Sequence, residues 1–280
     1  MPKAKYDAPA PLRLWHLASL DAPTVAVVWA LAFAWAAGVR LPIWVPVLLA
    51  LVVWVVYVAD RLLDARRAFG FGQRDSLRER HRFHWRYRRI LEPLAIAAAV
   101  AAAWIVVSRV PAASRGRDAV MGVAALAYFT RVHSGHRLAR GISRFRPPVL
   151  TKEFLVGLLF TAGCVLPAWN RVGLRAWPLV LPMAYFAGLA WLNCHAIDHW
   201  EAHASGNSIA RVAALLGVAG AISAVFVFAD EPRMAALLFS GAAAAMLLAL
   251  LDRTRGRLTP LTLRAAADLV LLTPVALLLK

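Results

Sequence analysis

Runs of about 20 mostly apolar residues recur along the whole chain, and they constrain its fold more than any other feature. A run of that length crosses the roughly 30 Å hydrocarbon core of a bilayer as an α-helix. Hydrophobic residues make up 61% of the 280 residues, well above the roughly 45–50% that is usual for a soluble domain. Because backbone groups in lipid must be hydrogen-bonded internally, the sequence predicts an all-α, polytopic membrane helical bundle.

Nine runs are candidates for transmembrane helices, and together they occupy the chain as a single membrane-embedded domain of residues 1–280. They cover residues 22–39, 42–60, 90–109, 118–132, 152–169, 176–194, 209–229, 233–251 and 260–279. The first run begins only after Asp21, and many further runs follow it, so we expect it to be a retained span and not a cleaved signal peptide. Small-residue patches such as 242–245 suit close helix packing in lipid.

The net charge of +17 follows from where the basic residues lie. Most of the 32 Lys and Arg residues fall before the first run or after the even-numbered ones. Such a bias places those segments in the cytoplasm, so we expect a bacterial inner (plasma) membrane protein with a cytoplasmic N-terminus and no nucleic-acid partner. Cys164 and Cys194 lie in or beside apolar runs, and we expect both to be reduced structural thiols.

Acidic residues stand where two of the apolar runs end, and charged groups near a span call for a partner or a function. Asp60 and Asp64 follow the second run, and a spacing of four puts both carboxylates on one face of a helix. Asp198 and Glu201 follow the sixth run, on the same predicted side of the membrane. Because Mg²⁺ prefers carboxylate oxygens, the two clusters predict a magnesium site between them.

Basic residues follow the first acidic pair closely. Arg61, Arg66 and Arg67 belong to an arginine-rich loop, predicted over residues 61–89. Guanidinium groups bind phosphate bidentately, and Mg²⁺ bridges carboxylates to phosphate oxygens. The combination predicts a diphosphate site, and its place in a membrane protein predicts a lipid as the substrate.

The layout of these motifs resembles the UbiA superfamily of intramembrane prenyltransferases over essentially the whole chain. The resemblance rests on nine spans, on Asp60-x-x-x-Asp64 after the second, on the acidic cluster 198–201 after the sixth, and on TKEFLVG at 151–157 opening the fifth. It implies a nine-helix bundle that transfers a prenyl group from an isoprenoid diphosphate donor to an aromatic or lipid acceptor, with Mg²⁺ as cofactor.

The resemblance also implies roles for individual residues. Asp60, Asp64 and Asp198 would be catalytic metal ligands, and Glu201 would be a fourth ligand or the partner of a metal-bound water. The residues that would bind the diphosphate of the substrate are Arg66, Arg67 and Lys152. Metal and guanidinium would stabilise the charge that develops on the leaving group.

Four other interpretations of the same residues stay open. A terpene cyclase of the UbiA type would capture the cation within the same molecule. Seven of the eight histidines lie at the predicted cytoplasmic face, namely 81, 84, 133, 136, 195, 199 and 203, and paired histidines are also typical of a His-box di-iron membrane oxidase. Intramembrane acids equally mark a transporter or a lipid-binding membrane protein. Finally, Asp60 and Asp64 could form only salt bridges at a helix end, for example between Asp64 and Arg67.

Overall fold

The structure is a computed structural model that describes residues 6–70, 78–112, 115–116, 152–202 and 206–279. Its α-helices are α1 (Ala10–Leu17), α2 (Asp21–Ala36), α3 (Trp44–Gly70), α4 (Glu79–Arg86), α5 (Arg88–Arg109), α7 (Lys152–Val172), α8 (Val180–Glu201), α9 (Ser208–Val227), α10 (Pro232–Thr254), α11 (Pro260–Val270) and α12 (Val275–Leu278). Two 3-10 helices, η3 (Gly173–Leu179) and η4 (Arg255–Arg257), extend α8 and α10.

The described helices confirm the predicted membrane bundle. Seven of them, counted with their short extensions, are long and apolar enough to cross a bilayer, and the bent pair α1 and α2 makes eight if it counts as one span. Eight of the nine predicted spans correspond to these helices. The fourth predicted span, residues 118–132, lies outside the described residues. The protein is therefore an integral membrane protein.

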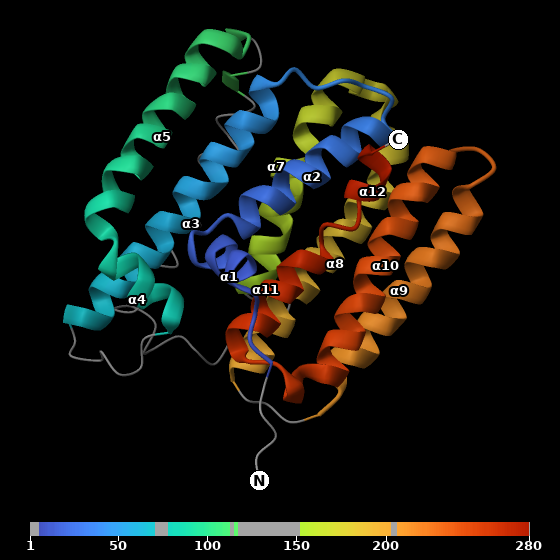
Figure 1. Ribbon diagram of the computed structural model, residues 1–280. Helices are drawn as coiled ribbons and strands as arrows, with labels where there is room; N and C mark the ends of the chain where they lie inside the picture. The colour runs from blue at the N-terminus through green and yellow to red at the C-terminus, as the bar shows by residue number, and fades with distance from the viewer. Residues whose placement is uncertain (1–5, 71–77, 113–114, 117–151, 203–205, 280) are drawn as a thin grey trace, which may run out of the picture.

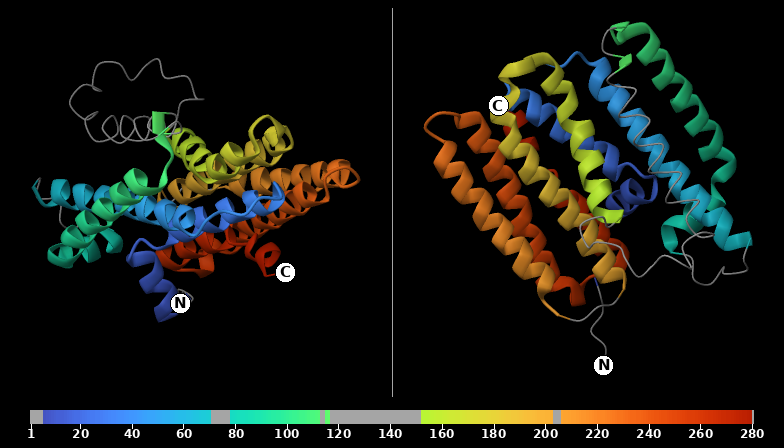
Figure 2. Two further views of the ribbon diagram at one scale, coloured as in Figure 1. Left: turned by 90° about the horizontal axis from the view of Figure 1, so that it is seen from above. Right: turned by 180° about the vertical axis from the view of Figure 1, so that it is seen from behind.

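The helices lie roughly side by side, as Figures 1 and 2 show, with α5 at one edge and α9 at the other. Both edge helices expose apolar side chains, including Ile96 and Trp104 on α5 and Leu215 and Phe226 on α9. Exposed apolar surface of this extent is unusual on a soluble protein but is what hydrocarbon requires. These edges therefore face lipid.

Helix α2 forms the centre of the bundle. Most of its residues are buried, and Trp29 stacks on Phe186 of α8 with ring centroids 3.8 Å apart. The indole N–H of Trp29 donates to the carbonyl of Leu271, just after α11, at 2.8 Å. This bond satisfies the one polar atom of a fully buried side chain, as a buried tryptophan requires. Packing around α2 thus fixes α8 and α11 relative to each other.

Three predicted helix ends differ from the structure, and two of these differences move candidate site residues. The sixth span was predicted to end at residue 194, whereas α8 continues to Glu201 and so includes Asp198. The second span was predicted to end at residue 60, whereas α3 continues to Gly70 and spans about 40 Å at about 1.5 Å per residue. The last span breaks after Val270, just before Pro274, since proline disrupts helix hydrogen bonding. Asp60 and Asp64 consequently lie inside the final turns of a continuous helix.

Helices α1 and α2 meet at an elbow, residues 18–20, where their axes differ by 87°. Ser19 has a φ of +60°, a left-handed conformation that is uncommon for a residue with a side chain. Contacts around the elbow hold it, because Trp54 of α3 donates to the carbonyl of Ala18 at 3.0 Å. The elbow carries His16 and Asp21 into the interior, on either side of Ser19.

Candidate functional site

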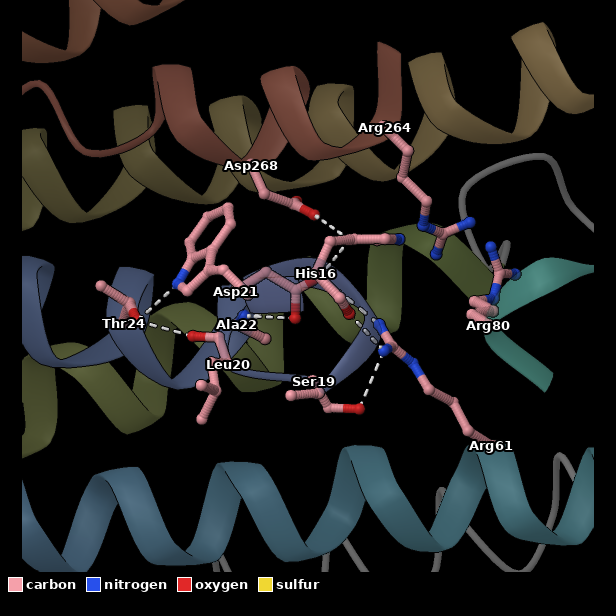
Figure 3. Close-up of polar contacts among 12 residues, drawn as sticks. His16, Ser19, Leu20, Asp21, Ala22, Thr24, Arg61, Arg80, Arg264 and Asp268 are labelled. Carbon is pink, nitrogen blue, oxygen red and sulfur yellow. Dashed lines mark hydrogen bonds and ion pairs between the residues drawn. The ribbon is translucent and has the colours of Figure 1, made fainter. Parts of the chain in front are cut away.

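Charged and polar side chains gather where the elbow meets α3, α4, α8 and α11. These elements meet in the lower part of the bundle in Figure 1. Figure 3 shows their arrangement, with His16 and Asp21 between Asp268 of α11 and Arg61 of α3. Buried ionisable groups in a membrane protein are expensive and mark functional sites. The network therefore contains the strongest functional candidates in the described part of the chain.

Arg61 joins α3 to the elbow. Its side chain is almost fully buried, and Nη1 donates to the carbonyl of His16 and to the hydroxyl of Ser19, each at 2.8 Å. Nη2 lies 3.4 Å from a carboxylate oxygen of Asp21. The planar guanidinium suits three acceptors at once. Arg61 therefore neutralises Asp21 and also holds the strained Ser19 conformation.

His84 of α4 continues this chain of hydrogen bonds. Its Nδ1 lies 2.8 Å from the carbonyl of Arg80, which can only accept, so Nδ1 carries the proton. Its Nε2 lies 3.0 Å from the Ser19 hydroxyl and, in the neutral imidazole, accepts from it. The Ser19 hydroxyl oxygen also accepts from Arg61. The hydrogen bonds then run from Arg61 to Ser19, from Ser19 to His84, and from His84 to the Arg80 carbonyl. The geometry suits a neutral imidazole that carries its proton on Nδ1.

Acid is therefore expected to destabilise the fold through His84. Burial, reinforced by the positive charge of Arg61, lowers the pKa of His84 from 6.5 to about 4. The unfolded chain takes up the proton first, so the contribution of His84 is complete above pH 6.5 and is lost as pH falls toward 4, by at most about 1.4 kcal/mol per pH unit. Melting temperatures of wild type and His84→Gln in detergent between pH 7.5 and 4 measure it. The variant should show the shallower pH dependence, and parallel curves would contradict this account.

His16, Asp21 and Asp268 form a compact group of possible ligand atoms. His16 Nδ1 is 2.6 Å from Asp21 Oδ2 and 3.8 Å from Asp268 Oδ2, and all three ligand atoms lie within 4.8 Å of one another. The amide of Asn193 on α8 donates to Asp268 at 3.1 Å. In the described part of the chain this is the one group of three such ligands.

Glu201, at the end of α8, is the centre of an arginine cluster. Arg264 of α11 and Arg80 of α4 contact its Oε1 at 2.6 and 2.9 Å, and Arg78 contacts its Oε2. Burial, together with the positive charge of Arg264, lowers the pKa of Arg80 to about 9. Three guanidinium groups around one carboxylate leave an excess of positive charge at this point.

The predicted acidic residues lie at the same end of the bundle. Asp64 is 44% exposed, and His81 of α4 lies 4.0 Å from its Oδ2. Asp60, one turn earlier on α3, is half-buried, and Asp198 is exposed on the last turns of α8. Glu201 engages the arginine cluster. No three of these four described carboxylates come as close together as the His16 group does.

The predicted diphosphate-binding residues do not form one cluster in the described structure. Arg66 is 63% exposed and lies 3.6 Å from Glu92 of α5, toward the edge of the bundle. Arg67 is half-buried near the end of α3. Lys152 begins α7, but its side chain lies outside what the structure describes. The guanidinium groups nearest the second acidic cluster are instead those of Arg78, Arg80 and Arg264.

Helix α4 connects the two predicted acidic clusters. Its consecutive residues Arg80 and His81 contact Glu201 of α8 and Asp64 of α3, respectively. Burial, with the charges of Arg80 and Arg78, lowers the pKa of His81 to about 3, so this imidazole is neutral at pH 7. Two clusters more than 130 positions apart in the sequence are thus bridged by one short helix.

A small, partly open cavity of about 40 Å³ lies beside this network. Its polar lining comes from Tyr57, Asn193 and Asp268, and apolar side chains such as Phe160 close the other side. The volume suits a water molecule, and it is far below that of an isoprenoid chain. The cavity therefore belongs to the buried polar group.

The histidines do not assemble into a His-box site in the described residues. His81 and His84 have separate partners on α3 and at the elbow, and His195 stacks on Trp191 with ring centroids 5.5 Å apart. The one described group of three candidate ligands contains a single histidine. Three further histidines of that hypothesis, at 133, 136 and 203, lie outside the described residues. The di-iron hypothesis gains no support from the described part of the chain.

The sequence analysis singled out neither His16 and Asp21 nor Arg264 and Asp268 as candidates, although a signal was present for the last two. Asp21 served there only to mark the start of the first apolar run. Arg264 and Asp268 stand four residues apart within the last apolar run, and charged residues at such positions call for a function just as Asp60 does. His16 precedes the first run and carries no comparable signal.

Comparison of the chain with family models, with curated proteins and with solved structures finds no match.

Proposed function

We propose that this protein is a Mg²⁺-dependent prenyltransferase, similar to the UbiA superfamily, that binds an isoprenoid diphosphate at the ends of α3 and α8. The observation that carries the proposal is the bridge formed by α4, whose Arg80 and His81 contact Glu201 and Asp64. It brings both acidic clusters and several guanidinium groups to one end of a membrane bundle. A substrate with a charged head and an apolar chain fits such a place.

The arginine cluster is suited to the diphosphate. Arg78, Arg80 and Arg264 all contact the one carboxylate of Glu201, so this cluster holds more guanidinium groups than carboxylates in direct contact with them. Arg264 Nε is buried and has no hydrogen-bond partner in the described residues, and a buried unpaired donor favours an acceptor. Glu201 in this proposal positions the guanidinium groups for bidentate contact with phosphate oxygens.

The exposed carboxylates are suited to the metal. Asp64 and Asp198 are open to solvent, as a hydrated Mg²⁺ requires, because this ion keeps several of its waters and binds one or two carboxylates together with substrate phosphate. Asp60 lies one turn from Asp64 on α3. Asp60, Asp64 and Asp198 would hold Mg²⁺, which neutralises charge on the diphosphate.

The proposed reaction needs little else from the protein. The bond between the first isoprenoid carbon and the diphosphate oxygen breaks, and its electron pair leaves with the diphosphate. The resulting allylic cation bonds to an aromatic or lipid acceptor, which releases a proton. The guanidinium groups stabilise the departing charge. An isoprenoid chain can stay in the hydrocarbon along the lipid-facing helices while its headgroup reacts at the helix ends.

Binding of the headgroup can be measured without knowing the acceptor. Farnesyl diphosphate with Mg²⁺ should raise the melting temperature of the purified protein in detergent, by an amount that grows with ligand concentration. Farnesol, which has the same chain and no diphosphate, should raise it much less, and EDTA should remove most of the effect of the diphosphate. Equal stabilisation by the alcohol and the diphosphate would contradict the proposed site.

A further inference from the structure

We propose that His16, Asp21 and Asp268 form a binding site for a divalent transition-metal ion, separate from the proposed magnesium site. One imidazole nitrogen and two carboxylate oxygens are ligands typical of Zn²⁺, Mn²⁺ or Fe²⁺. The proposal does not rest on the prenyltransferase assignment, because none of these three residues belongs to the acidic clusters at the ends of α3 and α8.

The distances suit a shared ion after small side-chain movements. A metal about 2.0–2.2 Å from each ligand atom keeps neighbouring ligand atoms roughly 3–3.5 Å apart. His16 Nδ1 is 3.8 Å from Asp268 Oδ2 and 2.6 Å from Asp21 Oδ2, so the first distance must shorten slightly and the second lengthen. Figure 3 shows Asp268 directed from α11 toward His16 at the elbow.

A buried ring nitrogen lies between two carboxylates at this place. His16 is 1% exposed, and its Nδ1 has no hydrogen-bond partner in the described residues. The 2.6 Å contact with Asp21 Oδ2 is an ion-pair distance and is not among the hydrogen bonds of the structure. Buried nitrogen atoms are rarely left without a partner. A metal ion on Nδ1 would provide one.

A second buried atom lies unpaired beside the group. Asn193 is 4% exposed, and its Oδ1 has no hydrogen-bond partner in the described residues, while its amide nitrogen donates to Asp268. Asn193 and Asp268 both line the 40 Å³ cavity, which has room for a water molecule. That water could complete the coordination of the metal and donate to the Asn193 oxygen.

The neighbouring arginines do not use up the two carboxylates. The contacts of Arg61 with His16 and Ser19, at 2.8 Å, are shorter than its 3.4 Å contact with Asp21. Arg264 makes its 2.6 Å contact with Glu201. Each guanidinium therefore has a closer acceptor elsewhere, and Asp21 and Asp268 keep oxygen atoms that can bind a metal.

The site would also link distant parts of the chain. His16 and Asp21 stand on either side of the elbow, and Asp268 belongs to α11. A metal that binds only the folded arrangement stabilises it. Metal loading should therefore raise the melting temperature as well as appear in the metal content.

The experiment uses the full-length protein purified without a polyhistidine tag. The protein is stripped with a chelator, reloaded with Co²⁺ or Zn²⁺ and desalted, and its metal content is measured by mass spectrometry. We expect about one metal per chain in wild type. His16→Gln and Asp268→Asn should each bind at least about tenfold more weakly, whereas His84→Gln, which alters a buried histidine of the same region, should load like wild type.

Spectroscopy on the wild-type protein tests the proposed ligands even if a variant fails to fold. X-ray absorption of the zinc-loaded protein should show nitrogen and oxygen ligands with one imidazole, and metal loading should raise the melting temperature. Absence of tight metal binding in wild type would overturn the proposal, and so would thiolate ligands or full loading of His16→Gln. Asp64→Asn should load normally, so a failed prenyltransferase assignment would leave this result unaffected.

Discussion

Replacing Asp64 by Asn should lower Mg²⁺-dependent release of pyrophosphate from an isoprenoid diphosphate by on the order of 10²- to 10³-fold. Asn keeps the size of the side chain and removes the charge that would bind the metal. Asp64 is 44% exposed, so the loss of its carboxylate should leave the melting temperature close to that of wild type. The rate is measured by a coupled pyrophosphate assay on purified protein.

The matched control is Asp230→Asn. Asp230 is an exposed residue between α9 and α10, at the opposite end of α9 from the end of α8. This variant should retain the wild-type rate. If both variants lost activity equally, or if Asp64→Asn kept the wild-type rate, Asp64 would not be a metal ligand.

Replacing Arg61 by Met should produce the largest loss of stability among these substitutions. Arg61 is 3% exposed and contacts three acceptors, His16, Ser19 and Asp21. Its removal leaves the buried charge of Asp21 without its guanidinium, which costs about 3–5 kcal/mol of unfolding free energy. The left-handed Ser19 conformation also loses a contact that holds it. Thermal unfolding in detergent, followed by circular dichroism, measures the effect.

Arg66→Met provides the comparison on the same helix. Arg66 is 63% exposed, and its 3.6 Å contact with Glu92 is a surface pair, worth at most about 1 kcal/mol. The Arg61 variant should therefore melt well below both wild type and the Arg66 variant. Similar melting temperatures for the two variants would show that Arg61 is not a structural centre of the elbow.

The fold could be predicted largely from hydrophobic runs. In lipid, each membrane helix must form its own backbone hydrogen bonds, and its side chains must be mostly apolar. Helix ends were harder to predict. Asp60 looked like the end of a span, yet α3 continues to Gly70, since a helix can leave the hydrocarbon without unwinding. The break before Pro274 was readable from the proline, whereas the elbow at Ser19 depends on contacts with Arg61 and Trp54.

The candidate site could be predicted only in part. Asp60, Asp64 and Asp198 carry a local signal, a charge at the end of an apolar run. The role of α4 carries none, because Arg80 and His81 are two among many basic residues of that loop and their contacts with Glu201 and Asp64 depend on tertiary packing. His16 likewise became a candidate only through its distance from Asp268, about 250 positions away in the sequence.

The functional arginines could not be identified from the sequence either. The positive-inside bias predicts many basic residues at one side of a membrane protein whatever their individual roles, so the sequence could not rank them. The structure directs Arg66 toward Glu92 of α5, and it gathers Arg80 and Arg264 around Glu201. Selection among equally charged residues therefore required the packing of α4 and α11 against α8.

The most direct test of the proposed function is pyrophosphate release by the wild-type protein. Purified protein in detergent or liposomes is incubated with isoprenoid diphosphates of several chain lengths, with and without Mg²⁺, and with a panel of aromatic and lipid acceptors. We predict Mg²⁺-dependent release of pyrophosphate, abolished by EDTA, with a prenylated acceptor among the products. A cyclic hydrocarbon product would instead indicate a terpene cyclase, and no release with any donor and acceptor would contradict the proposed function.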